Sequence, residues 1–230
     1  MTSRKIEYWV IPPDADAEFA ASREEVRDVY ARPYDARYPV VCMDEQPIQL
    51  LKETRRPIAG TKRHPRRVDY EDERAGTARL FLFCEPLSGW RQVSVRDRRT
   101  KVDWAREVEG LLPTRYPSAE RVSLVCDNLN THTQGAFYEA FEPAKARALV
   151  RRLAFCHTPK HGSWLTIAEN ELSARTRQGI MGRRFATVEE LREETTAGHE
   201  HSNARQRGVD WQFKVDDARL KLKSVYQLFP

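Results

Sequence analysis

The sequence has no long apolar run and few cysteines. Nowhere do about 20 apolar residues follow one another, as a membrane-spanning helix requires, and no leading segment resembles a secretion signal. The four cysteines, Cys42, Cys84, Cys126 and Cys156, are far apart, contain no C-x-x-C pair, and lie in or beside apolar stretches. We therefore expect reduced, buried thiols in a cytoplasmic protein that has no membrane partner.

Internal repeats and low-complexity segments are also missing from the 230 residues, which suffice for one large domain or two small ones. Apolar residues make up 40% of the chain, enough for a buried core. Lys and Arg number 39 against 34 Asp and Glu, a net charge of +5. This modest excess suits a polyanionic partner such as nucleic acid without identifying one, because net charge reports on solubility and non-specific binding.

Five short apolar stretches predict strands, at residues 40–44, 77–85, 90–96, 121–127 and 153–157. A short turn joins the second and third, which favours an antiparallel hairpin. The last two each follow a helical pattern, so we expect them to run parallel to the first. Because a right-handed crossover can place the fourth strand beside the first, the sequence predicts an α/β fold with a five-stranded mixed sheet of order 3-2-1-4-5, flanked by helices.

The segments between the strands are helical or polar. Residues 48–53, "IQLLKE", are expected to form a helix or a loop, and residues 55–76 an exposed excursion. The basic half of that excursion, "RRPIAGTKRHPRR", is either a solvated loop or one that contacts phosphates. Apolar spacing predicts helices over residues 16–32 and 101–112, and over five further stretches toward the C-terminus: 135–141, 143–153, 165–180, 187–206 and 216–228.

Two of the expected strands share a design in which an apolar run and a cysteine precede an acid near the carboxyl end. "VVCMDE" gives Asp44 and "LVCDN" gives Asp127. Ligands bind at this edge of open α/β sheets, and a divalent cation keeps two adjacent carboxylates ionised. A helical third acid, Glu169 or Glu171, would complete a site for two ions. Two positions on a helix differ by about 200°, so only one of them faces the site, and periodicity does not decide which.

Plainer interpretations exist for the same residues. Asp and Asn favour turns, so "DNLNTH" is also what a strand-ending turn contains. A second candidate cluster, Cys156 and His157 with His161, has the donor types of a zinc site but lacks an apparent fourth ligand.

The chain resembles the catalytic domain of bacterial insertion-sequence transposases of the mariner superfamily, which carry an Asp-Asp-Glu triad on a ribonuclease H-like fold. The resemblance extends over nearly the whole chain. It rests on the segments "VVCMDEQPIQLL", "DYEDERAGTARLFLFCEPLSGWR", "DRRTKVDWA", "DNLNTHT", "FYEAFEPAKAR", "TPKHGSWLTIAENELS" and "VDWQFKVDDARLKLK". One departure is Thr166, where the family usually has Asn three residues before the third acid.

This resemblance implies the site and its chemistry. Asp44, Asp127 and Glu169 match the triad, which would hold two Mg²⁺ or Mn²⁺ ions for DNA strand cleavage and transfer of the freed 3′ hydroxyl. Asn128, Asn130 and His132 would orient the substrate. The DNA-binding candidates are Lys160 and His161 near the third acid, and Lys62, Arg63, Arg66 and Arg67 in the basic loop.

The expected organisation is a linker and N-terminal helix over residues 1–35 and a catalytic domain over 36–230, without the helix-turn-helix modules that relatives carry. Partners would be DNA, a second copy in the active complex, and a DNA-binding protein from an upstream frame if the gene is split. Two alternatives remain at this stage: a non-catalytic fragment that binds DNA or a full-length transposase, and a ribonuclease H-like nuclease with another substrate.

Overall fold

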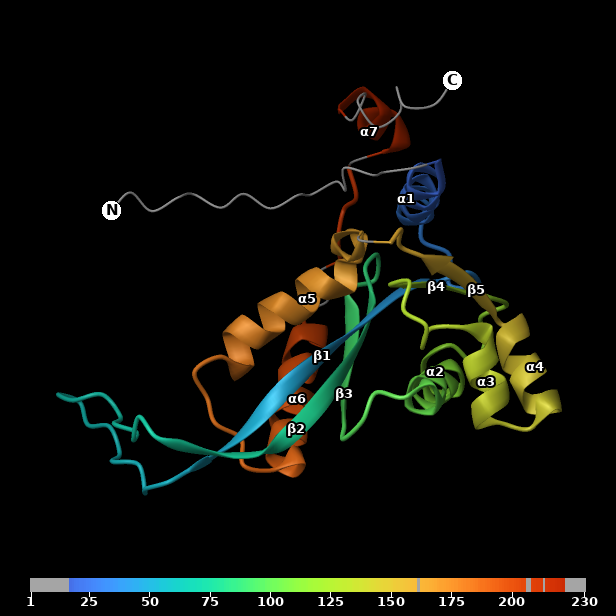
Figure 1. Cartoon of the computed structure of the whole chain (residues 1–230). Helices are drawn as coiled ribbons and strands as arrows, with labels where there is room; N and C mark the ends of the chain where they lie inside the picture. Colours follow the sequence, from blue (N-terminus) through green and yellow to red (C-terminus); the bar gives the residue numbers. More distant parts are fainter. Residues whose placement is uncertain (1–16, 161, 206–207, 213, 222–230) are drawn as a thin grey trace.

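A computed structural model describes residues 17–160, 162–205, 208–212 and 214–221. Its five-stranded sheet has the order β3-β2-β1-β4-β5, which confirms the predicted topology (Figure 1). β1 pairs antiparallel with β2, and β2 with β3, whereas β4 runs parallel to both β1 and β5. The strands are β1 (Val40–Glu53), β2 (Asp72–Glu85), β3 (Trp90–Arg96), β4 (Val122–Cys126) and β5 (Leu153–His157).

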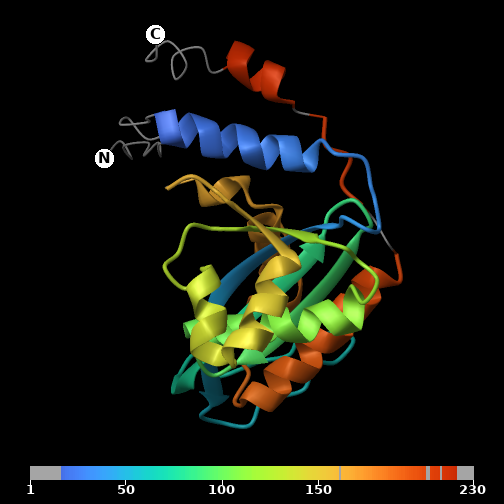
Figure 2. The same cartoon turned by 90° about the vertical axis from the view of Figure 1, so that its right-hand side faces the viewer.

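Helices cover both faces of the sheet. One face carries α2 (Lys101–Arg115), α3 (Gln134–Ala140) and α4 (Pro143–Arg151), and the other carries α5 (Ile167–Arg175) and α6 (Val188–Asn203) (Figure 1). In Figure 2, α1 (Ala17–Tyr30) and α7 (Val215–Lys221) lie side by side at the top of the molecule. Among the described residues, no helix has the length and apolar character needed to cross a membrane.

The core consists of two apolar clusters, one on each side of the sheet. Successive strand residues point to opposite faces, so β1 gives Cys42 to the cluster under α5 and α6 and Met43 to the cluster under α2 and α3. Phe81 and Phe83 of β2 extend the second cluster. All four cysteines are buried, as expected, and none of them forms a disulfide in the structure.

The N-terminal helix belongs to the first of these clusters. Val26, Val29 and Tyr30 of α1 are buried together with Cys42 and with residues of α5. α1 also contacts β5, the strand at the edge of the sheet. The proposed boundary after residue 35 stays a prediction, but α1 shares its core with the sheet.

Local sequence signals explain where several helices begin. Thr100 caps α2 and forms a capping box with Asp103, which satisfies two backbone N–H groups at the helix start. Pro143 occupies the first turn of α4, where its missing N–H costs nothing. Thr187 caps α6 by accepting a hydrogen bond from the backbone nitrogen of Glu190.

The first strand is much longer than the sequence predicted. Residues 48–53 were expected to form a helix or a loop, but they continue β1 and pair with β2. Their burial alternates, since Ile48 and Leu50 are buried and Gln49 is exposed. The pairing shifts between Leu50 and Leu51, which leaves Ala75 of β2 as an extra residue beside Gly76, whose φ of 114° suits glycine. Pairing along β2 therefore outweighs the helical character of "IQLLKE".

The long β1–β2 hairpin projects beyond the sheet, and Figure 1 shows its tip far from the helices. We call residues 54–71 the hairpin tip. Ile58 and Arg67 pair across it through two backbone hydrogen bonds of 2.9 and 3.0 Å. The side chain of Arg184 supports its base, contacting Glu53 at 2.5 Å and the backbone oxygen of Asp69 at 2.8 Å. The predicted excursion is thus exposed, although residues 72–76 belong to β2.

Candidate active site

The first two acids meet where β4 ends beside β1. The last pair in the parallel register is Cys42 with Val125, so continuing by two residues brings Asp44 level with Asp127. Asp127 follows the last residue of β4, as predicted. Asp44 does not end its strand, because β1 runs on to pair with β2. The edge at which the two acids meet is therefore created by the end of β4 alone.

The third acid reaches this edge from α5, which packs on β1. Glu169 lies in the first turn of α5. Burial, together with the negative charges of Asp127 and Glu169, raises the pKa of Asp44 to about 6, although a hydrogen bond from the Glu45 backbone nitrogen acts in the opposite direction. The charges of Asp127 and Glu169 therefore act on Asp44, while the assignment of the three acids as a catalytic triad stays a prediction.

The Glu171 side chain forms an ion pair with a residue of β3. Its two carboxylate oxygens contact Arg91 of β3, at 2.5 Å from Nε and 2.8 Å from a terminal nitrogen. Such a two-point contact fixes both side chains. Because Glu171 points to Arg91 and Glu169 affects Asp44, the structure distinguishes two acids that periodicity left equivalent.

Several buried polar atoms around this edge suit an ion or an oxygen-rich ligand. Within the described residues, Oε2 of Glu169 and the hydroxyl groups of Thr131, Thr158 and Thr166 are buried without a hydrogen-bond partner. Buried polar atoms normally have partners, and a hard cation takes oxygen ligands. As the side chains stand, no three His, Cys, Asp or Glu residues in the described part of the chain form a ready-made metal cluster. The chemistry of the donor set, carboxylate and hydroxyl oxygens, fits a hard cation such as Mg²⁺ or Mn²⁺.

His132 lies behind Asp127 in a buried network that the sequence did not reveal. Its Nδ1 is 2.6 Å from Oδ1 of Asp127, and its Nε2 is 3.0 Å from Oε1 of Glu45. Burial lowers the pKa of His132, but the two carboxylates outweigh it and raise the pKa to about 9. Glu45 also pairs with Arg99 at 3.2 Å. The alternation of β1 was the available signal, since Glu45 must face away from Asp44, toward the α2 side.

The remaining predicted residues occupy different places. Asn128 and Asn130 are exposed in the loop after β4, and Lys160 is exposed after β5. His161, the third candidate zinc ligand, lies outside the described residues. Of the other two, Cys156 is buried and the Nε2 of His157 contacts the backbone oxygen of His132 at 2.8 Å. Lys62, Arg63, Arg66 and Arg67 are exposed on the hairpin tip, which projects away from β4 and α5 in Figure 1.

Thr166, the position that departs from the resembled family, begins α5. It is the residue before the first turn, and its backbone oxygen accepts a hydrogen bond from the Glu169 nitrogen at 3.1 Å. Its hydroxyl group makes no capping hydrogen bond, although threonine often does so at this position. The hydroxyl group is therefore not used by the helix and stays buried without a hydrogen-bond partner.

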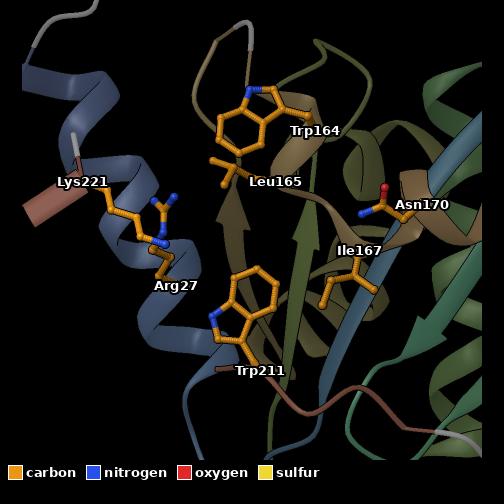
Figure 3. A pocket seen from close by; sticks show the side chains of 7 residues that line it. All are labelled: Arg27, Trp164, Leu165, Ile167, Asn170, Trp211 and Lys221. Atoms are coloured by element: carbon orange, nitrogen blue, oxygen red, sulfur yellow. The ribbon is translucent and has the colours of Figure 1, made fainter. Parts of the chain in front are cut away.

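A cavity of about 290 Å³ lies on the other side of the α5 start, between α1 and the segment before α7 (Figure 3). Trp164 and Trp211 line it from two sides, with Ile167 between them and Asn170 at its edge. Its lining is mostly apolar and includes none of the three acids. The cavity is thus separate from the acidic edge.

Solved structures with a similar fold come from the Mos1 transposase. A pre-cleavage Mos1 transpososome has a TM-score of 0.57 at 13% identity, covering 99% of this chain and 68% of that one. The Mos1 mariner paired-end complex with Mn has a TM-score of 0.54 at 15% identity, covering 98% and 66%. This chain spans about two thirds of the length of those chains. At such identity the similarity shows the fold, which is ribonuclease H-like.

A family match covers most of the same region. No curated protein matches the sequence. Residues 39–192 match the family described as DDE superfamily endonuclease, and they contain β1 to β5 and the three acids Asp44, Asp127 and Glu169. Since the match extends over more than half of the 230 residues, the chain belongs to the DDE superfamily endonucleases.

Proposed function

We propose that this chain is the catalytic domain of a DNA transposase of the insertion-sequence type, in which Asp44, Asp127 and Glu169 form the catalytic triad. The observation that carries the proposal is the convergence of these acids. Asp44 is partly buried and feels the charges of the other two, an arrangement that costs free energy unless cations are bound. Carboxylates held together at such a cost are typical of a functional site.

The three carboxylates would bind two Mg²⁺ or Mn²⁺ ions. When bound, such ions supply activation of a water molecule and stabilisation of the leaving oxygen in a phosphodiester displacement. The protein contributes the position of each carboxylate: β1 holds Asp44, the end of β4 holds Asp127, and the first turn of α5 holds Glu169. Because residues of these elements share one core, the fold would hold the three carboxylates at the same sheet edge before DNA arrives.

DNA would be both substrate and partner. Asn128 and Asn130 are exposed next to Asp127, where they would orient the scissile strand, and Lys160 is exposed after the neighbouring strand. The hairpin tip presents four exposed cations, Lys62, Arg63, Arg66 and Arg67. Arg66 also lies 3.6 Å from Glu53. The similar Mos1 chains were solved as paired-end complexes with transposon DNA, which favours a homodimer holding two element ends here.

The test is cleavage of a labelled duplex that carries the terminal repeat flanking the gene, with Mn²⁺ or Mg²⁺ supplied. Asp127→Asn should remove cleavage while the duplex is still bound. Asp97→Asn, at an exposed position after β3, is the matched control and should cleave like the parent. The proposal fails if the Asp127 variant cuts as well as the parent, or if the parent binds this DNA but never cuts it with either metal.

A further inference from the structure

The side chain of His132 is buried and fully engaged. It is 1% exposed, yet both ring nitrogens face carboxylates, Asp127 at 2.6 Å and Glu45 at 3.0 Å. His132 therefore has no nitrogen left for a substrate. Its only route to the chemistry passes through Asp127.

Several buried contacts also fix the side of the imidazole ring that faces away from Asp127. The Glu45 side chain is 1% exposed and pairs with Arg99 at 3.2 Å through its second oxygen. Trp104 of α2, which is fully buried, lies against the imidazole with ring centroids 5.3 Å apart. His157 fixes the backbone, since its Nε2 contacts the oxygen of His132 at 2.8 Å. The ring is thus fixed by residues from β1, α2 and β5.

We propose that His132 is a positioning residue for the DNA-cleavage reaction: Glu45 and Arg99 fix its ring, and its Nδ1 holds the Asp127 carboxylate in the orientation that receives a divalent cation. This inference rests on the proposed function, because it assigns Asp127 to cation binding. The contact is an ion pair with one carboxylate oxygen, Oδ1, and Nδ1 also lies 3.4 Å from the backbone oxygen of Asp127, so the second carboxylate oxygen is left for an ion. Hydrogen bonds that orient metal-binding groups are a general requirement of metal sites.

If His132 had a purely structural role, a different feature of its side chain would be essential. Buried ionic groups add little net stability compared with apolar groups of the same volume, so packing alone gives no reason for a histidine between two acids. If the ring only filled space beside Trp104 and tied down Glu45, the contact with Asp127 would be dispensable. If the ring positions Asp127, the donor at Nδ1 is the essential feature.

Two matched substitutions separate these roles. The amide nitrogen of asparagine can take the place of Nδ1, whereas that of glutamine takes the place of Nε2. His132→Asn therefore keeps a donor for Asp127 and loses the contact with Glu45. His132→Gln keeps the contact with Glu45 and loses the donor for Asp127. Isothermal titration calorimetry with MnCl₂ in the absence of DNA gives the readout, with thermal unfolding to verify that each variant is folded.

We expect His132→Gln to weaken Mn²⁺ binding about 10–100-fold, as loss of an orienting partner does in other metal sites, and His132→Asn to weaken it several-fold less. The Mn²⁺ affinity of Glu45→Gln should lie between those of the parent and His132→Gln. His199→Asn is the control, because His199 is half-buried on α6 and its Nδ1 accepts a hydrogen bond from Val93 at 3.4 Å. That variant should bind Mn²⁺ like the parent.

The outcomes distinguish the inference from the function on which it rests. If His132→Asn and His132→Gln are folded and bind Mn²⁺ as the parent does, the positioning role is wrong, and the triad assignment stands. If His132→Asn loses as much affinity as His132→Gln, the Asp127 contact is not what matters, and the inference fails. If the parent binds no Mn²⁺ at all, the proposed function fails together with it.

Discussion

The hydroxyl group of Tyr30 lies 3.3 Å from the backbone nitrogen of Ile167, the first residue of α5. The same hydroxyl group donates to the backbone oxygen of Leu165 at 3.2 Å, and the thiol of Cys42 approaches it at 3.3 Å. Cys42 precedes Asp44 by two residues, and Ile167 precedes Glu169 by two. One buried side chain of α1 therefore links the strand that holds the first acid to the helix that holds the third.

The substitution Tyr30→Phe removes the hydroxyl contacts and keeps the packing of the ring, so it tests the link alone. The substitution leaves the Ile167 N–H and the Leu165 oxygen buried without their partner, so we expect the free energy of unfolding to fall by about 1–3 kcal/mol. It should also weaken Mn²⁺ binding, because the start of α5 is no longer fixed relative to β1. Urea denaturation and calorimetry measure the two effects. Tyr138→Phe, at an exposed position on α3, is the control. A Tyr30 variant as stable as the parent would contradict the link.

The pKa of Asp44 predicts an unusual dependence of stability on pH. Its value of about 6 in the folded protein exceeds the ordinary 3.8, so the folded state binds this proton more tightly than the unfolded state. Ionised Asp44 therefore destabilises the metal-free protein above pH 6, and the penalty disappears as the pH falls toward 4. In EDTA, Asp44→Asn should be about 1–3 kcal/mol more stable than the parent at pH 8 and equal to it near pH 4.

Added Mn²⁺ should reverse that order at pH 8. A cation that binds only the folded state stabilises it in proportion to the logarithm of its concentration, and the parent has the carboxylate that the variant lacks. Thermal unfolding in EDTA and in excess Mn²⁺ at both pH values tests this prediction. If Mn²⁺ leaves the stability of the parent unchanged, no cation binds at Asp44. If the variant is never more stable than the parent, Asp44 is not held at an electrostatic cost.

Glu169 and Glu171 should respond in opposite ways to the same substitution. Glu169→Gln should reduce DNA cleavage by more than about 100-fold, since even orienting partners of metal-binding groups are worth about 10–100-fold. Glu171→Gln breaks the contact with Arg91 and should cost about 1–3 kcal/mol of stability while cleavage below the unfolding temperature is largely kept. Cleavage rates and melting curves of the two variants provide the comparison. If Glu171→Gln lost cleavage and Glu169→Gln lost only stability, the third acid would be Glu171.

The hairpin tip should contribute to DNA binding through charge. Replacing Lys62 and Arg63 together by alanine should lower the slope of log Kd against log salt by about 2, because each lost phosphate contact releases about one fewer counterion. Arg147 and Arg151 on α4 are also exposed, and their double replacement removes the same charge elsewhere. Binding isotherms at several salt concentrations measure both slopes. If the two double variants had equal slopes, the hairpin tip would be a solvated loop without specific phosphate contacts.

Local patterns determined much of this fold. Each of the five strands was predicted from apolar runs, and the sheet order followed from the connections between them, because hairpins and crossovers restrict how strands can pair. The meeting of Asp44 and Asp127 followed as well, since parallel neighbours bring equivalent positions to the same edge. The length of β1 did not follow, because "IQLLKE" becomes a strand only through its pairing with β2.

What the sequence determined by itself was the set of acids and the sheet edge where they meet, since alternation and connectivity act over neighbouring residues. Only the tertiary structure decided which glutamate of α5 faces Asp44, because that choice depends on Arg91, about 80 residues away. It also placed Glu45 and His132 behind Asp127, through a contact between residues 87 positions apart. Such pairings depend on how α2, α5 and the sheet pack together, and no local pattern records that packing.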